Sequence, residues 1–339
     1  MIESRNEAAG RGQGLMRDTQ PKLLILGTPP TSWFAAAAGL HELTRVQKAD
    51  DPHDDADRVR DAEIVFLWEH AGNRFRDCWP HAHTLRWVQS GSAGVEKLLF
   101  PALAQSPVVL TNSRGLYAEP LAEFVLFCVL FFAKNFGFLE RHRRARQWQR
   151  YHPAELHGAT LGIVGFGGTG RATARLAKAF GMKVLALKRR PGAAAGQDLV
   201  DHLVPREARR ELLAESDYVV NALPLTAETA GYFDETAFGS MKTAACFINV
   251  GRGGTVDEQA LIRALREGRI AGAGLDVFQQ EPLPAGSELY TLPNVIVSPH
   301  SADLTDRYPP RSARFFLENL KRYVSGQPLL NVVDKSLGY

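Results

Sequence analysis

The stretch that decides the fold is Thr160-Leu161-Gly162-Ile163-Val164-Gly165-Phe166-Gly167-Gly168-Thr169-Gly170. Its first five residues have the apolar character of a buried strand, and an Ala-rich segment of helical character follows its last glycine. Residues 165–170 between them match G-x-G-x-x-G, a pattern that holds the pyrophosphate of a dinucleotide at the N-terminus of a helix. A glycine-rich turn that merely joins a strand to a helix is the alternative, and the strand-turn-helix context disfavours it.

Each glycine of this turn has a physical role. Gly165 permits the tight turn, Gly167 lets the backbone approach a pyrophosphate, and Gly170 allows the helix to pack closely on the strand. Gly168 and Thr169 lie at the start of the helix, whose N-terminus faces the anion. We therefore expect all five residues to contact a dinucleotide cofactor.

Short apolar runs recur after this loop, and helix-length segments separate them. Further strands are predicted at residues 183–187, 217–221, 244–250, 270–277 and 294–297. Together with residues 160–164 they make six strands that alternate with helices, which predicts a doubly wound parallel sheet.

The same alternation precedes the loop. Strands are predicted at residues 22–27, 63–68, 85–89 and 108–111, and a helix at residues 33–43. A long apolar helix over residues 121–138, followed by the basic run 141–150, is the candidate crossing between two domains. The helix expected at residues 311–324 comes after the sixth strand of the second series, so we expect it to pack back on the first domain.

Composition limits the class of protein. A chain of 339 residues is long enough for two cores, and a net charge of +3 is too small to indicate a nucleic-acid or membrane partner. The most apolar stretch, residues 124–133, is about half of what a bilayer span requires. The three cysteines are widely spaced, which favours reduced, buried thiols and a cytoplasmic location; they are Cys78, Cys128 and Cys246.

The choice of cofactor depends on the end of the strand at residues 183–187. NAD-binding versions of this fold carry an acidic residue there for the ribose 2′-hydroxyl. This chain has Lys188-Arg189-Arg190 instead, and these cations could hold the 2′-phosphate of NADP. We predict that NADP is preferred over NAD, with a solvated basic turn as the alternative.

Four polar side chains follow strands at the edge of the second sheet where open parallel sheets bind ligands: Arg252, Asp276, Glu281 and His300. A 2-oxo acid presents a carboxylate that Arg252 can grip bidentately, and a carbonyl that His300 can protonate as a hydride arrives. Glu281 can stabilise the imidazolium, and Asp276 can accept a hydrogen bond from a nicotinamide carboxamide. No metal is expected here. Singly each signal is weak, because a lone histidine is more often structural, but together they point to hydride transfer at the 2-carbon of a small acid.

With these motifs the chain resembles the D-isomer-specific 2-hydroxyacid dehydrogenase family, in particular its glyoxylate and hydroxypyruvate reductases. The resemblance covers residues 23–330 and is carried by residues 87–95, 111–115, 165–170, 221–229, 249–257, 275–283 and 298–300. It implies two Rossmann-like doubly wound domains, the nucleotide domain being inserted in the substrate domain. The implied limits are a flexible tail at 1–20, a substrate domain at 21–120 with 301–339, and a dinucleotide domain at 121–300.

The resemblance also implies roles for particular residues. Arg252 binds the substrate carboxylate, His300 is the acid/base, and Glu281 pairs with that histidine. The backbone N–H groups of Ser92, Ala93 and Gly94 complete the carboxylate site from the other domain. Cofactor contacts outside the glycine loop are expected from Leu223, Pro224, Thr229, Gly251 and Asp276. Members of the family form homodimers, so a homodimer is expected.

Two departures from the commonest family pattern leave the acid's side chain open. Residues 301–303, Ser-Ala-Asp, follow the histidine where many members have a small or apolar run ending in glycine, and Glu96 replaces the more usual aspartate. Both changes leave the triad of Arg252, Glu281 and His300 intact. The residues beside His300 border the pocket, so they bear on the choice of substrate.

Other activities and one other class of protein share this scaffold. Formate dehydrogenases carry glutamine where Glu281 stands, which disfavours that activity, whereas the triad is compatible with phosphite oxidation. A dinucleotide-sensing transcriptional corepressor would bind the cofactor without significant turnover, but no feature of the sequence suggests a peptide groove. We therefore predict an NADPH-dependent reductase of small 2-oxo acids.

Overall fold

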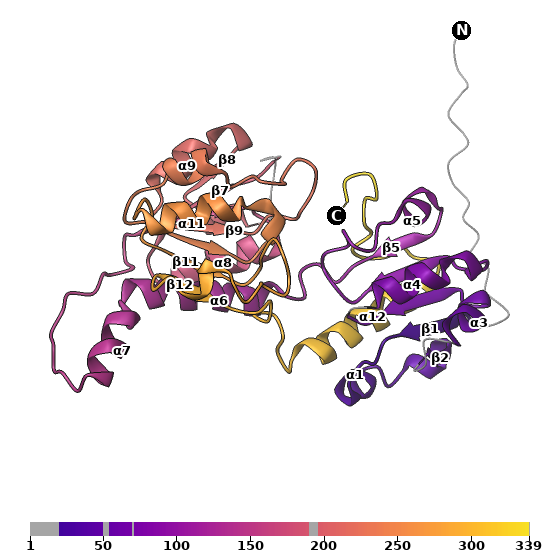
Figure 1. Cartoon of the computed structure of the whole chain (residues 1–339). Coiled ribbons are helices and arrows are strands. Elements are labelled where there is room, and N and C mark those ends of the chain that lie inside the picture. Colours follow the sequence, from indigo (N-terminus) through magenta and orange to yellow (C-terminus); the bar gives the residue numbers. More distant parts are fainter. Residues whose placement is uncertain (1–19, 50–53, 70, 190–195, 339) are drawn as a thin grey trace, which may run out of the picture. The chain divides into compact units, whose positions relative to one another are not determined.

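The computed structural model describes residues 20–49, 54–69, 71–189 and 196–338 (Figure 1). The tail predicted at residues 1–20 thus lies outside the described residues, Gln20 excepted. The chain forms two compact α/β units. Unit 1 comprises residues up to 92, 97–113 and 309–335, and unit 2 comprises residues 93–96, 114–308 and the C-terminal residues from 336. Unit 2 is therefore inserted in unit 1. The domain limits predicted from the sequence, 21–120 with 301–339 and 121–300, remain a prediction.

Unit 1 is built on a five-stranded parallel sheet in the order β2-β1-β3-β4-β5, the order of flavodoxin-like folds. Its elements are β1 (Lys22–Leu26), α1 (Thr31–Ala36), α2 (Leu40–Leu43), β2 (Arg45–Ala49), α3 (Asp55–Arg60), β3 (Ile64–Leu67), α4 (Gly72–Cys78), β4 (Trp87–Ser90), α5 (Pro101–Gln105), β5 (Val109–Thr111) and α12 (Tyr308–Val324). As predicted, the late helix α12 packs on this unit: Phe316 stacks on Trp87 with ring centroids 5.4 Å apart.

Two predictions for unit 1 were wrong in detail. The helix predicted at residues 33–43 is interrupted after Ala36, and α1 and α2 are separate short helices. The strand β2 was missed because it lies at the edge of the sheet, where its sequence Arg-Val-Gln-Lys-Ala needs no apolar run.

Unit 2 is built on a seven-stranded parallel sheet in the order β12-β11-β10-β9-β6-β7-β8. Its elements are β6 (Thr160–Val164), α8 (Gly168–Ala179), β7 (Lys183–Leu187), β8 (His202–Val204), α9 (Arg209–Glu215), β9 (Tyr218–Asn221), α10 (Glu235–Gly239), β10 (Cys246–Asn249), α11 (Glu258–Arg266), β11 (Gly272–Leu275) and β12 (Val295–Val297), preceded by α6 (Ala118–Ala133) and α7 (Phe136–Arg144). The order reverses between β6 and β9, as in Rossmann folds, and ligands of such sheets bind at that switch point. The predicted fold class is thus confirmed.

Two features of unit 2 differ from the sequence prediction. All six predicted strands are present, but the short, partly exposed edge strand β8 was missed. The helix predicted over residues 121–138 is two helices, α6 and α7, which meet at 62°. The break lies at Asn135, which has a φ of +44° and caps α7 by accepting a hydrogen bond from the N–H of Phe138. Within the described residues no single helix is long and apolar enough to cross a membrane.

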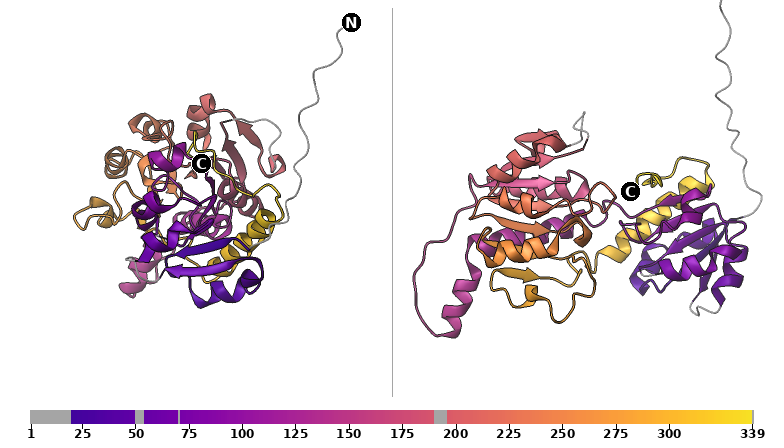
Figure 2. Two further views of the ribbon diagram at one scale, coloured as in Figure 1. Left: turned by 90° about the vertical axis from the view of Figure 1, so that its right-hand side faces the viewer. Right: turned by 45° about the horizontal axis from the view of Figure 1, so that its top comes forward.

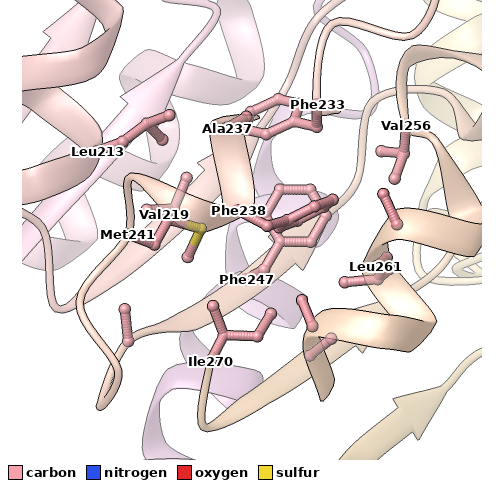
Figure 3. Close-up of a cluster of buried hydrophobic side chains, with 14 of the residues drawn as sticks. Leu213, Val219, Phe233, Ala237, Phe238, Met241, Phe247, Val256, Leu261 and Ile270 are labelled. Atoms are coloured by element: carbon pink, nitrogen blue, oxygen red, sulfur yellow. The ribbon is translucent and has the colours of Figure 1, made fainter. Parts of the chain in front are cut away.

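Helices cover both faces of this sheet. Alternate residues of its central strands point to opposite sides, and they are apolar on both sides, so each face needs a cover. Val219 and Phe247 belong to one buried cluster, and their neighbours Val220 and Ile248 belong to the other. In the first cluster the ring of Phe247 packs against those of Phe233 and Phe238 (Figure 3), at centroid distances of 4.8 and 5.3 Å. Burying each such ring contributes about 1.5–3 kcal/mol, so the core holds the carboxyl ends of the strands in fixed positions.

All three cysteines are free and buried, as predicted. Burial raises the pKa of Cys128 and of Cys246 to about 12, and that of Cys78 to about 11. The thiols are therefore protonated near neutral pH. The cytoplasmic location inferred from them remains a prediction.

Candidate active site

The glycine loop after β6 leaves one side of the backbone open. Gly165 has a φ of +106°, and a Cβ there would lie 2.7 Å from the carbonyl oxygen of Ala222. A Cβ on Gly170 would overlap the carbonyl oxygen of Gly165. Beside Gly167, by contrast, no atom of the described residues lies within 4 Å of such a Cβ, and no described side chain caps the start of α8. Open space beside uncapped N–H groups fits the pyrophosphate of a dinucleotide.

The loop after β9 lies beside this glycine loop, because the N–H of Ala222 donates to the carbonyl of Val164 at 2.9 Å. It contains three of the predicted cofactor residues. The N–H of Leu223 donates to Asn221, and the hydroxyl of Thr229 donates to the carbonyl of Pro224 at 2.6 Å. The Thr229 hydroxyl therefore shapes this loop.

The predicted 2′-phosphate site follows β7. Arg189 lies 3.5 Å from the carboxylate of Glu228, which lies 3.6 Å from the guanidinium of Arg206 as well. Lys188 is half-buried, and Arg190 lies outside the described residues. Glu228 thus holds two arginines near one another at this end of the sheet, and Arg206 was not predicted from the sequence.

His300 and Glu281 form the predicted pair. His300 Nδ1 lies 2.8 Å from Glu281 Oε2, and the other carboxylate oxygen accepts the N–H of Phe278 at 3.0 Å. His300 has a φ of +51°, a strained conformation for a residue with a side chain, of the kind that is common at functional sites. With Nδ1 against the carboxylate, Nε2 is the ring nitrogen available to a substrate.

Asp276 fixes the turn that carries this histidine. Its Oδ1 atom accepts hydrogen bonds from the Ser298 hydroxyl at 2.6 Å, the Ser301 N–H at 3.0 Å and the Ala302 N–H at 3.1 Å. The side chain is almost fully buried. From the sequence, Asp276 was predicted only to accept a hydrogen bond from the nicotinamide, and the structure adds this second role of ordering the loop on either side of His300.

Arg252 is held by a carboxylate of its own unit. Its Nε donates to Glu96 Oε1 at 2.6 Å, and its Nη1 donates to the carbonyl of Gly251 at 2.7 Å. Gly94 lies against the same guanidinium, since a Cβ there would overlap Arg252 Nη2, and Ala93 precedes it in the same segment. Glu96 was noted in the sequence only as a departure from the family pattern, and no spacing rule links it to an arginine 156 residues away.

Two predicted site residues have other neighbours. Ser92 belongs to unit 1, where its N–H donates to the hydroxyl of Ser90 at 3.1 Å. Gly251 follows β10, and its N–H donates to the side chain of Asn249 at 3.1 Å. The structure thus brings Gly94 to Arg252, while the predicted role of the Ser92 N–H remains a prediction.

Gly253 brings the arginine loop against the loop that carries Glu281. A Cβ on Gly253 would overlap the carbonyl group of Phe278, whose N–H donates to Glu281. Asp303 lies in the same neighbourhood: burial raises the pKa of its carboxyl, while the charges of His300 and Arg252 lower it. Carboxylates and a guanidinium are therefore grouped around the histidine.

The arrangement of Arg252, Glu281 and His300 agrees with a comparison of the chain with known protein families. Residues 126–302, about half of the chain, match the model of the family described as D-isomer specific 2-hydroxyacid dehydrogenase, NAD binding domain. The chain belongs to the D-isomer-specific 2-hydroxyacid dehydrogenase family. As a member of this family, it is an NAD(P)-dependent oxidoreductase.

Individual relatives of this dehydrogenase cover most of its length. The glyoxylate reductase of Thermococcus gammatolerans is 34% identical over 292 residues, which are 83% of this chain and 85% of the relative. A family member from Xanthobacter autotrophicus Py2, solved with NADPH and MES, is 33% identical, has a TM-score of 0.80 and is aligned over 95% of this chain and 100% of that one. The NADPH-dependent glyoxylate/hydroxypyruvate reductase of Sinorhizobium meliloti, solved with NADP and sulfate, is 29% identical with a TM-score of 0.82 over 95% of this chain and 100% of that one.

Proposed function

We propose that this dehydrogenase works as a reductase of small 2-oxo monocarboxylic acids, such as glyoxylate and hydroxypyruvate, with NADPH as the preferred cofactor and NAD(H) as the weaker one. The product is a 2-hydroxy acid, of D configuration where C2 becomes chiral. The observation that carries the proposal is the His300–Glu281 pair, 2.8 Å apart, in the unit that also contains the open glycine loop and Arg252. The names of the two reductases compared above support the same substrates.

NADPH supplies the hydride when it is bound, with its pyrophosphate at residues 165–170. The protein's own groups do the rest. Arg252 holds the substrate carboxylate with the guanidinium N–H groups that do not donate to Glu96 or to the carbonyl of Gly251. His300 donates a proton from Nε2 to the carbonyl oxygen as negative charge develops there, and Glu281 stabilises the imidazolium beforehand.

Negative side chains near Arg252 favour substrates with a single carboxylate. Glu96 accepts a hydrogen bond from the guanidinium, and Asp303 follows His300 by three residues. A second carboxylate on the substrate would meet these groups at a cost of like-charge repulsion. Glyoxylate and hydroxypyruvate avoid that cost.

The preference for NADPH is assigned to Arg189 together with Lys188. The pair with Glu228 is half exposed, so it is worth little in itself and can yield to a 2′-phosphate. Arg206, on the other side of Glu228, is a second guanidinium available to the same phosphate. The resemblance to enzymes solved with NADPH or NADP agrees with this assignment.

Replacing Arg189 with alanine is expected to lower kcat/KM for NADPH about 10- to 100-fold, the value of a charge-assisted hydrogen bond, and to leave kcat/KM for NADH almost unchanged. Steady-state kinetics with both cofactors measures the ratio. Lys183→Ala, at the other end of β7 and paired with Glu215, is the control and should change neither value. A wild-type enzyme that prefers NADH, or an equal loss with both cofactors, would contradict the assignment.

We also propose that the protein is a homodimer that pairs through α6 and α7. Phe127 and Phe136 are about half exposed, and their rings lie within 6.1 Å of Phe131 in a continuous aromatic row. The segment after α7 extends from unit 2 and carries Trp148, whose side chain is 97% exposed (Figures 1 and 2). Exposed aromatic patches of this kind mark protein interfaces, and the family resemblance gives a second copy as the partner.

Sedimentation equilibrium is expected to give twice the chain mass for the wild type at micromolar concentration, and a shift to monomer for Phe127→Glu. Glu211→Lys, an equal charge change at an exposed position on α9, outside α6 and α7, is a control that should not dissociate the dimer. A monomeric wild type would contradict this proposal.

A further inference from the structure

Three polar side chains are completely enclosed behind the arginine loop. Asn221 ends β9, Asn249 ends β10, and Thr255 lies in the short helix η5 (Gly253–Thr255) that follows Arg252. Their exposed fractions are 0%, 1% and 0%, and the two asparagines face each other in the register of the sheet. Burying polar groups is unfavourable unless each is hydrogen-bonded, so their partners show what the arrangement is for.

The three side chains bond to one another in a fixed direction. The amide nitrogen of Asn221 donates one hydrogen to Asn249 Oδ1 at 2.9 Å and the other to Thr255 Oγ1 at 2.6 Å. The hydroxyl of Thr255, having accepted from Asn221, donates its own hydrogen to the carbonyl of Arg252 at 2.6 Å. Turning the Asn221 amide over would set two oxygens against each other, so only one orientation satisfies every group.

The outward bonds of this network all reach the main chain of the two functional loops. Asn221 Oδ1 accepts the N–H of Leu223, and Asn249 Oδ1 accepts the N–H of Gly251. The carbonyl of Gly251 in turn accepts the Arg252 Nη1 atom. The guanidinium is therefore tied to Gly251, whose N–H is held by Asn249. The carbonyl of Arg252 accepts the Thr255 hydroxyl at 2.6 Å and, more weakly, the amide nitrogen of Asn249 at 3.4 Å.

We propose that Asn221, Asn249 and Thr255 are positioning residues for substrate binding: they fix the backbone on both sides of Arg252 so that its guanidinium is already placed for the carboxylate. The inference rests on the proposed function, in which Arg252 binds that carboxylate. The sequence gives a weak indication of this role: two buried strands end in asparagine, at positions where apolar residues are expected. Through Leu223 the network also reaches the loop proposed to line the cofactor.

A purely structural role makes a different prediction. A network that only stabilises the fold would, when broken, lower the melting temperature and the yield of active enzyme while leaving KM unchanged. A positioning role predicts a change in KM for the 2-oxo acid in the fraction that is folded. Tm and KM must therefore be measured on the same variants.

Thr255→Val keeps the shape of the side chain and removes the hydroxyl, which leaves the Arg252 carbonyl and one Asn221 hydrogen without that partner. We expect KM for glyoxylate to rise about 10-fold or more, the effect of one buried hydrogen bond lost at a binding group, with the Kd for NADPH within about twofold of wild type. Thr255→Ser restores the hydroxyl and should return KM to near the wild-type value. Thr255→Ala also lacks the hydroxyl and serves if the valine variant does not fold.

Arg252→Gln distinguishes a failure of the positioning role from a failure of the proposed function. If it raises KM steeply while Thr255→Val and Thr255→Ala leave KM unchanged, the positioning role is wrong and the proposed function stands. If Arg252→Gln itself leaves KM unchanged, the proposed function is wrong at that residue. A rise in KM with both hydroxyl-free variants, reversed by serine, supports the positioning role.

Discussion

His300→Ala is expected to lower kcat on the order of 10²-fold or more, because the substrate carbonyl then loses its general acid. Dinucleotide binding should be unaffected, since the predicted cofactor loop lies after β6. The expected loss is in kcat, with KM for the 2-oxo acid changed far less, because proton donation matters in the transition state and not in the bound substrate. Steady-state kinetics with a separate titration of NADPH binding measures both.

Two further variants test whether the His300–Glu281 pair donates the proton as proposed. Glu281→Gln keeps an acceptor 2.8 Å from His300 but removes the negative charge that favours imidazolium, so it should be slower than wild type and faster than His300→Ala. His202→Ala changes an exposed histidine on β8 and should leave kcat unchanged. An unaltered kcat in His300→Ala would remove the residue from the mechanism.

Gly253→Ala is expected to destabilise unit 2 by about 3 kcal/mol or more and to reduce kcat/KM at least about 10-fold. The added Cβ would overlap the carbonyl group of Phe278, which is main chain and cannot rotate away. Either the arginine loop or the segment leading to Glu281 must then move, and the His300–Glu281 pair is disturbed. Thermal unfolding and steady-state kinetics on the same preparation measure the two effects.

Gly254→Ala is the matched control one residue along. Its Cβ would lie 3.0 Å from the end of the Leu225 side chain, which can turn aside. We expect a change in stability within about 1 kcal/mol and nearly full activity. If both alanine variants behave alike, the close approach of Gly253 to Phe278 does not matter to the site.

The sequence predicted the features that follow from local pattern. An apolar strand, a glycine turn and an Ala-rich helix identified the start of the nucleotide unit, and the polar residues after β10, β11 and β12 were predicted to be the reacting groups. The parallel sheet is confirmed, and His300 and Glu281 are in contact because strand ends of a parallel sheet meet at one edge. The catalytic roles of these residues remain predictions. Edge strands β2 and β8 were missed because neither needs apolar residues on both faces.

Contacts between distant parts of the chain could not be read from the sequence. The pair of Glu96 with Arg252 spans 156 positions and follows no spacing rule. The bonds among Asn221, Asn249 and Thr255 depend on the register of β9 against β10, which apolar runs alone do not fix. The apolar spacing predicted one helix through Asn135, whereas the helix ends there. Asn135 has a left-handed backbone and caps α7, and apolar spacing does not indicate either feature.

We propose that this dehydrogenase reduces 2-oxo acids with NADPH. The most direct test follows the absorbance of NADPH and of NADH on addition of glyoxylate, hydroxypyruvate and larger 2-oxo acids, with dinucleotide binding titrated in parallel. We expect turnover of the two small acids, faster with NADPH than with NADH. Binding of the dinucleotide without turnover of any 2-oxo acid would contradict it and would indicate a dinucleotide sensor on the same scaffold.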